Sequence, residues 1–185
     1  MEKYGVGYDC VVFDLETTGL DPERDQICEI GAVAVRDGLP CASFGTLVAI
    51  DGKMPEAASR INGITDEMLA EEGMPLVAAL REFVGGLRGA VLVGHNIDSF
   101  DIPFVKAACA RVGVDFPDLP TFDTLTVARE LWPELPRHSM AYLREVLGIE
   151  RDDAHRALAD CFDELAVLNA ELASGVAVSY GILEG

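Results

Sequence analysis

Two carboxylates alternate with apolar residues in the first hydrophobic run of the chain, VVFDLETTGL at residues 11–20. Side chains two apart on a strand point to the same face, so Asp14 and Glu16 share a face. Neighbouring carboxylates repel one another and resist desolvation, and a hard divalent cation such as Mg²⁺ is the simplest compensation. The run therefore predicts a metal site at the end of a core strand. A strand end that simply reaches solvent is the alternative interpretation.

A second acidic segment, GHNIDSFDIPFV at residues 94–105, lies where an expected strand gives way to an expected helix. Such strand–helix junctions are common positions for functional groups. Asp101 would project inwards from the first turn of the helix, whereas Asp98 is more typical of a capping or loop carboxylate. We therefore expect Asp101 to be the functional residue, with helix capping as its alternative role.

The third segment, DDAHRALADC at residues 152–161, contains a candidate base and another carboxylate. His155 and Asp160 are five residues apart, which is a rotation of about 140° on a helix. They can share a site only if His155 lies in the loop or in a frayed first turn. A helix N-terminus favours neutral imidazole, which a general base requires. Taken singly, each is more simply interpreted as a solvated surface residue.

The elements that would position these residues follow from hydrophobic periodicity and turn signals. Strand-like stretches rich in Val, Ile and Ala occupy residues 8–15, 27–36, 42–50, 90–93 and 121–123. Helical patterns occupy residues 75–87, 102–112, 124–131, 139–147 and 156–173. The Asp37–Gly38 pair predicts a turn, Ser139 an N-cap, and Gly113 and Gly148 helix ends.

Strands followed by alternating strands and helices predict a layered α/β fold with a mixed sheet of about five strands flanked by helices. A length of 185 residues is typical of one domain. We expect that domain at residues 1–175, followed by a tail at 176–185 whose order the sequence does not decide.

The composition is strongly acidic, with 14 basic and 32 acidic residues and a net charge of −18. This balance argues against broad electrostatic capture of long nucleic acids. It remains compatible with an enzyme that holds a nucleic-acid end locally, through metals, backbone amides and base stacking.

The cysteines number five, an odd count without a C-x-x-C pair. We expect buried apolar thiols rather than a zinc site or disulfides. No apolar run approaches the roughly 18 residues of a membrane span, and the first residues lack a secretory pattern. We therefore expect a cytoplasmic protein without membrane association.

Together the three segments resemble the DEDDh family of 3′→5′ exonucleases, which includes the epsilon subunit of bacterial DNA polymerase III, RNase T, oligoribonuclease and TREX-type enzymes. The family motifs stand here as DLETTG, HNIDSFD and HRALAD, in family order, and lesser matches are INGIT, DEML, FDTL and RHSM. The resemblance covers residues 11–172. The second motif is one residue longer than in the epsilon subunit and is similar to the TREX type, which affects the expected contacts near residues 97–100.

The resemblance implies a ribonuclease H-like three-layer fold and two Mg²⁺ ions, with Mn²⁺ able to substitute. Asp14, Glu16 and Asp160 would hold the first ion, and Asp14 would bridge to the second. Asp101 would support the second ion through water, and His155 would orient and deprotonate the attacking water. Four carboxylates and two ions roughly 4 Å apart would give a nearly neutral site for a phosphodiester.

The resemblance also implies a site for the 3′-terminal nucleotide. This nucleotide would lie over the turn formed by Thr17, Thr18 and Gly19. The residues expected around its base are Leu20, Ile61, Asn62, Asn96 and Phe100. For the apolar members of this set, Leu20, Ile61 and Phe100, ordinary core packing is the alternative.

We therefore expect a 3′→5′ exonuclease that releases nucleoside 5′-monophosphates from single-stranded DNA ends. Degradation of short RNA is the alternative activity. A non-catalytic nucleic-acid or partner-binding module is a competing class, disfavoured because all five catalytic-type residues are present. A homodimer and a polymerase partner both stay open.

Overall fold

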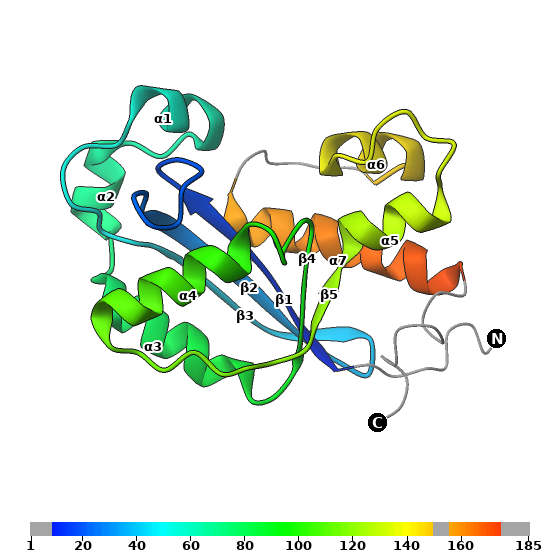
Figure 1. The fold of residues 1–185 in the computed structure, drawn as a ribbon, viewed down its shortest axis with the longest axis horizontal. Helices are drawn as coiled ribbons and strands as arrows, with labels where there is room; N and C mark the ends of the chain where they lie inside the picture. The colour runs from blue at the N-terminus through cyan, green and yellow to red at the C-terminus, as the bar shows by residue number, and fades with distance from the viewer. Residues whose placement is uncertain (1–8, 150–155, 175–185) are drawn as a thin grey trace.

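The computed structural model describes residues 9–149 and 156–174 (Figure 1). His155 and the predicted tail at 176–185 lie outside these ranges. The strands are β1 (Cys10–Thr17), β2 (Ile27–Arg36), β3 (Leu39–Leu47), β4 (Val91–Gly94) and β5 (Thr121–Asp123). The helices are α1 (Glu56–Asn62), α2 (Asp66–Glu72), α3 (Leu76–Leu87), α4 (Asp101–Val112), α5 (Thr124–Leu131), α6 (Met140–Leu147) and α7 (Ala157–Ala173). Within the described ranges, no helix is long and apolar enough to cross a membrane.

The strands form one mixed sheet in the order β3-β2-β1-β4-β5. The first three pair antiparallel, whereas β4 runs parallel to both β1 and β5. Helices cover the sheet from both sides, with α3 and α4 on one face and α5 and α7 on the other (Figure 1). The predicted layered α/β architecture with a five-stranded mixed sheet is confirmed.

The alternation of side chains along β1 determines which residues lie on each face of the sheet. Val11, Phe13 and Leu15 pack in the core with α3 and α4. Cys10 and Val12 pack on the opposite face with α5 and α7. Because the period of a strand is two residues, the next positions on the α7 face are those of the two predicted metal ligands of β1.

Two helices and two strands differ from the sequence-based expectation, and β1 runs on to Thr17 where we expected it to end at residue 15. Helices α1 and α2 were not predicted, because seven residues each are too few to show a clear helical period. Strand β3 occupies 39–47 rather than 42–50. It begins directly after Asp37 and Gly38, which adopt positive φ values of 52° and 73° in a tight hairpin turn that sets the register.

The predicted helix ends are largely confirmed. Gly113 and Gly148 both adopt a left-handed φ of 67° after α4 and α6. Ser139 is the N-cap residue of α6, but its side chain makes no capping hydrogen bond. The hydroxyl therefore does not stabilise the first turn in the way that the sequence suggested.

The cysteine prediction holds at four positions and fails at one. Cys10, Cys28, Cys109 and Cys161 are buried free thiols, whereas Cys41 is an exposed free thiol. Cys41 lies on β3, an edge strand of the sheet, where apolar neighbours in sequence do not ensure burial.

Helix α7 buries an acidic residue in its last turns. Glu171 is 0% exposed, and within the described ranges neither of its carboxylate oxygens has a hydrogen-bond partner. Burial, aided by the negative charge of Asp123, raises the pKa of Glu171 to about 9. A buried carboxyl without partners favours its neutral form, so we expect Glu171 to keep its proton at neutral pH.

We expect the variant Glu171→Gln to be more stable than the wild type above neutral pH. In the folded protein the pKa of Glu171 lies above the ordinary value of 4.5. The contribution of Glu171 to the free energy of unfolding is therefore complete below pH 4.5 and is lost as the pH rises towards 9. At pH 7 the difference in the free energy of unfolding should be roughly 1–3 kcal/mol. Urea unfolding at pH 5, 7 and 9 measures it. A difference that does not grow with pH would contradict the assignment.

Candidate active site

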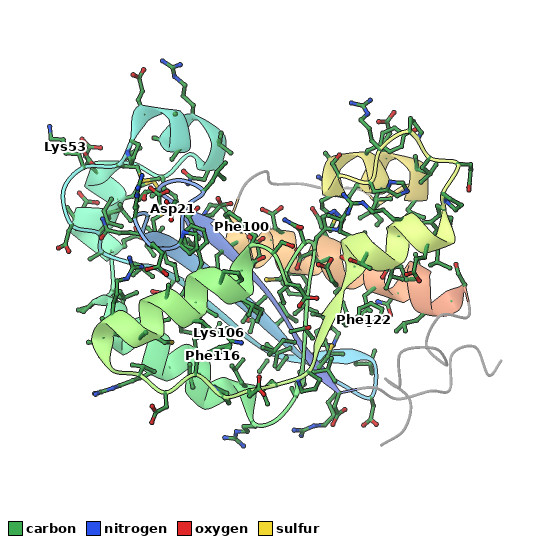
Figure 2. The ribbon with its side chains drawn as sticks, viewed as in Figure 1. Asp21, Lys53, Phe100, Lys106, Phe116 and Phe122 are labelled. Atoms are coloured by element: carbon green, nitrogen blue, oxygen red, sulfur yellow. The ribbon has the colours of Figure 1, made fainter. Side chains whose placement is uncertain are left out.

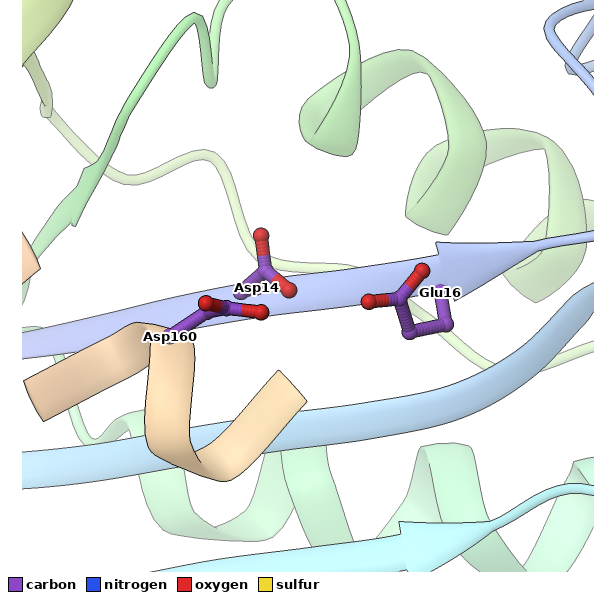
Figure 3. A group of neighbouring side chains, drawn as sticks. All are labelled: Asp14, Glu16 and Asp160. Carbon is purple, nitrogen blue, oxygen red and sulfur yellow. The ribbon is translucent and has the colours of Figure 1, made fainter. Parts of the chain in front are cut away.

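Three carboxylates from two elements meet on the α7 side of the sheet. Asp14 and Glu16 come from the last half of β1, and Asp160 comes from the first turn of α7 (Figure 3). One oxygen of each lies within 4.8 Å of the others, and all three side chains are partly buried. The shared face predicted for Asp14 and Glu16 therefore exists, and α7 brings the third predicted metal ligand against it.

Asp101 reaches the same region from the opposite layer. It is the first residue of α4 and is 3% exposed, whereas Asp98 in the preceding loop is exposed. Strand β4 pairs with β1 only as far as Val12. Beyond that point of β1, the backbone N–H of Leu15 donates to the Asp101 carboxylate. The other carboxylate oxygen, Oδ1, is buried without a hydrogen-bond partner within the described ranges.

The electrostatics show that the site is crowded with negative charge. Burial raises the pKa of Asp14 well above its usual range, and the charges of Glu164, Asp101, Glu16 and Asp160 raise it further. Burial also raises the pKa of Asp101 to about 8, against the lowering effect of its backbone hydrogen bonds. An oxygen-only ligand set with an unpaired buried oxygen is what a hard divalent cation such as Mg²⁺ requires, so the residues present fit such an ion.

The start of α7 is fastened to β2. Glu29 Oε1 accepts from Arg156 Nε at 2.9 Å and Nη2 at 2.8 Å, and Glu29 Oε2 accepts from the Ala157 N–H at 3.1 Å. A Cβ at Gly31 would lie only 2.3 Å from the Ala157 carbonyl carbon, so the close approach needs a glycine there. These contacts set the position of Asp160 relative to β1.

We expect Glu29→Gln to loosen this attachment. The change removes the negative charge of Glu29 that faces the Arg156 guanidinium. This loss should lower the free energy of unfolding by about 1–3 kcal/mol. Urea unfolding measures the loss, and amide hydrogen exchange should show less protection in the first turn of α7. The matched control is Glu72→Gln, an exposed glutamate that also acts on Arg156. Equal effects of the two variants would contradict the proposed attachment.

The loop after β4 is held by Asp123 and Thr124 at the start of α5 and by the backbone of His138. The partly buried ring of His95 contacts Thr124 Oγ1 through Nδ1 at 3.0 Å and the His138 carbonyl through Nε2 at 2.8 Å. Burial lowers the pKa of His95, which favours a neutral ring. The backbone N–H of Asn96 donates to Asp123 Oδ1 at 3.0 Å. This fixed loop leads into Asp101, so its rigidity helps to position that carboxylate.

The predicted nucleotide turn is stabilised internally. Thr17 Oγ1 donates to the Gly19 carbonyl at 2.6 Å, and Thr18 Oγ1 donates to Asp25 Oδ1 at 3.3 Å. A Cβ at Gly19 would lie 2.3 Å from the Asp25 carboxylate, so the turn closes tightly on that side chain.

The apolar candidates for base contact divide into two kinds. Leu20 is 84% exposed and Ile61 is 67% exposed, so core packing is excluded for both. Phe100 lies at the N-terminal end of α4, partly buried, with its ring centroid 4.9 Å from that of Phe104 (Figure 2). Phe100 therefore packs partly on the core, as its alternative interpretation allowed.

Asn62 and Asn96 are placed differently from one another. Asn62 is buried, with Oδ1 accepting from the Ile64 N–H at 3.1 Å and Nδ2 facing Cys28 Sγ at 3.8 Å. These contacts hold the chain as it leaves α1. Asn96 is partly buried in the loop after β4, with a positive φ of 68°.

Sequence reasoning missed three acidic residues that the fold brings to this region. Glu29 holds the start of α7, and Asp123 caps α5 by accepting from Leu125 N at 2.9 Å. Glu164 Oε1 accepts from the His95 N–H at 3.0 Å, and Glu164 is 3% exposed. Its spacing of four from Asp160 was a usable signal, because residues four apart lie on one helix face.

Comparison with known proteins identifies the family. The model of the exonuclease family RNase_T matches residues 11–168. The epsilon subunit of DNA polymerase III from Aquifex aeolicus is 35% identical over 164 residues, which are 88% of this chain and 77% of that protein. The PolC-type DNA polymerase III of Latilactobacillus sakei is 38% identical over 152 residues, 81% of this chain. The chain belongs to the DEDDh-type exonuclease family.

Solved structures agree with this assignment. Exonuclease X in complex with 5′-overhanging duplex DNA has a TM-score of 0.70 at 27% identity, covering 89% of this chain and 92% of that chain. Exonuclease I has a TM-score of 0.80 at 22% identity over 92% of this chain and 41% of that one, which supports the ribonuclease H-like fold alone. The chain spans only 10% of the length of the L. sakei polymerase.

Proposed function

We propose that this protein is a divalent-metal-dependent 3′→5′ exonuclease that removes nucleoside 5′-monophosphates from single-stranded DNA ends. The observation that carries the proposal is the convergence of Asp14, Glu16 and Asp160, with oxygens within 4.8 Å of one another. Membership of the exonuclease family supplies the reaction type.

Two Mg²⁺ ions fit the carboxylates of the site, and Mn²⁺ should replace them. Asp14, Glu16 and Asp160 would hold one ion, and Asp14 with Asp101 would hold the other. When bound, such ions lower the pKa of a water nucleophile and stabilise charge on the attacking and leaving oxygens of a phosphodiester. They would also offset the carboxylate charge that otherwise repels the phosphate.

The remaining steps belong to the protein's own side chains. We assign His155, which lies outside the described residues, as the base that takes the proton of the attacking water. The exposed side chains of Leu20 and Ile61 offer apolar surface to the terminal base. The turn formed by Thr17, Thr18 and Gly19 would support the terminal nucleotide. Such contacts require a base free of its partner, which favours single-stranded ends.

DNA is preferred over RNA as the substrate because of the relatives. The epsilon subunit and the PolC-type chains are named as parts of DNA polymerase III, and exonuclease X was solved with DNA. Short RNA is the alternative. The net charge of −18 favours short or locally held ends for either polymer.

The site predicts mononucleotide release from the 3′ end of a DNA oligonucleotide in Mg²⁺ or Mn²⁺. Gel analysis of 5′-labelled and 3′-labelled DNA and RNA strands reads out polarity and substrate class together. EDTA should abolish the reaction, and Asp14→Asn should abolish turnover because it removes the carboxylate shared by both ions. Cleavage that persists in EDTA, or internal cuts, would contradict the proposal. A preference for RNA would favour the alternative substrate.

The choice between the two aspartates of the second motif gives a sharper test. Asp101 is 3% exposed and faces Asp14, whereas Asp98 is exposed. We expect Asp101→Asn to lower kcat on the order of 10- to 100-fold, and Asp98→Asn to change it little. Steady-state kinetics on a short single-stranded DNA measure both, with circular dichroism as a check on folding. The reverse order would show that Asp98 is the functional residue.

Further organisation is proposed on sequence grounds. We propose a cytoplasmic protein with one exonuclease domain over residues 1–175. Because the relatives include a polymerase subunit and polymerase chains, a polymerase is one proposed partner. A homodimer is the other proposed assembly.

A further inference from the structure

A glutamate that none of the family motifs includes lies on α7 beside the acidic site and acts on Asp14. Glu164 follows Asp160 by one helical turn on α7 and is 3% exposed. Its Oε1 accepts from the backbone N–H of His95 at 3.0 Å. Its Oε2 is buried, and within the described ranges it has no hydrogen-bond partner.

The charge of Glu164 acts on one proposed metal ligand, Asp14, and the charge of another, Asp101, acts on Glu164. Among the neighbouring carboxylates, Glu164 acts most strongly on Asp14, and Asp101 acts most strongly on Glu164. Asp101 Oδ1 is likewise buried without a hydrogen-bond partner. Two unpaired oxygens, one from α7 and one from α4, therefore lie in the same negatively charged region.

Glu164 differs from the buried Glu171 in its neighbours, because the carboxylates of Asp14 and Asp101 act on it or are acted on by it. The bond to the His95 N–H needs one carbonyl-type oxygen, which a glutamine would supply equally well. A buried carboxylate oxygen without a partner is costly, and additional like charge makes it more so. A cation that contacts this oxygen would offset the cost.

We propose that Glu164 is an additional cation ligand, which forms a second divalent-cation subsite with Asp14 and Asp101 beside the subsite of Asp14, Glu16 and Asp160. The inference rests on the proposed metal-dependent function. It adds a fifth carboxylate to the four that the motifs supply. The bond between Glu164 and His95 would also couple occupation of this subsite to the loop that carries Asp101.

Titration of the full-length protein with MnCl₂ alone, without nucleic acid, tests the inference by calorimetry. The wild type should bind two Mn²⁺ ions. Glu164→Gln should retain the first and weaken the second by roughly tenfold or more. The metal-free variant should melt at a higher temperature than the wild type, because the cost of burying a carboxyl with an unpaired oxygen has been removed, while its gain in Tm on adding Mn²⁺ should be smaller.

Glu171→Gln is the matched control. Glu171 is seven residues further along α7 and is also buried, and within the described ranges neither of its carboxylate oxygens has a hydrogen-bond partner. This variant should likewise raise the Tm of the metal-free protein. Its Mn²⁺ isotherm and its gain in Tm with Mn²⁺ should match those of the wild type.

The outcomes separate the inference from the proposed function. An unchanged Mn²⁺ isotherm for Glu164→Gln overturns the role of Glu164 and leaves the first subsite standing. A metal-free variant with a lowered Tm also overturns it, because that result shows a structural role. A wild-type protein that binds no Mn²⁺ overturns the proposed metal-dependent function itself.

Discussion

Repulsion among carboxylates is the constraint around which this fold is built. One carboxylate oxygen from each of Asp14, Glu16 and Asp160 lies within 4.8 Å of the others, and burial together with neighbouring charges raises the pKa of Asp14. Such a cluster persists only where the rest of the protein holds its elements firmly in place. The metal ions proposed for the site would turn this unfavourable arrangement into a binding site for a negatively charged backbone.

The forces that oppose the repulsion come from the core and from α7. Leu15 and its alternate neighbours on β1 bury apolar surface under α3 and α4, which fixes the face that the carboxylates occupy. Glu29 and Gly31 of β2 bring the first turn of α7 close to the sheet. His95 ties the loop after β4 to α5 and α7. Packing of the core and of α7 therefore holds together carboxylates that would otherwise repel one another.

The features of the fold and site that could be predicted from the sequence follow from patterns among residues close together in the chain. The shared face of Asp14 and Glu16 follows from strand period, and the inward position of Asp101 follows from its place at a helix start. Contacts between distant segments carry no such local signal, so the link from Glu164 to His95, 69 residues apart, was missed. Helices α1 and α2 were not predicted because seven residues are too few to show a clear helical period of apolar side chains. Ile61, which lies on α1, is exposed.

The proposed reaction depends on a divalent-cation site that β1 and α7 form together. A crystal structure of the protein with Mn²⁺, with anomalous diffraction data, tests it most directly. We expect an anomalous peak in contact with oxygens of Asp14, Glu16 and Asp160. Anomalous density only elsewhere on the protein, or none at millimolar Mn²⁺, would contradict it.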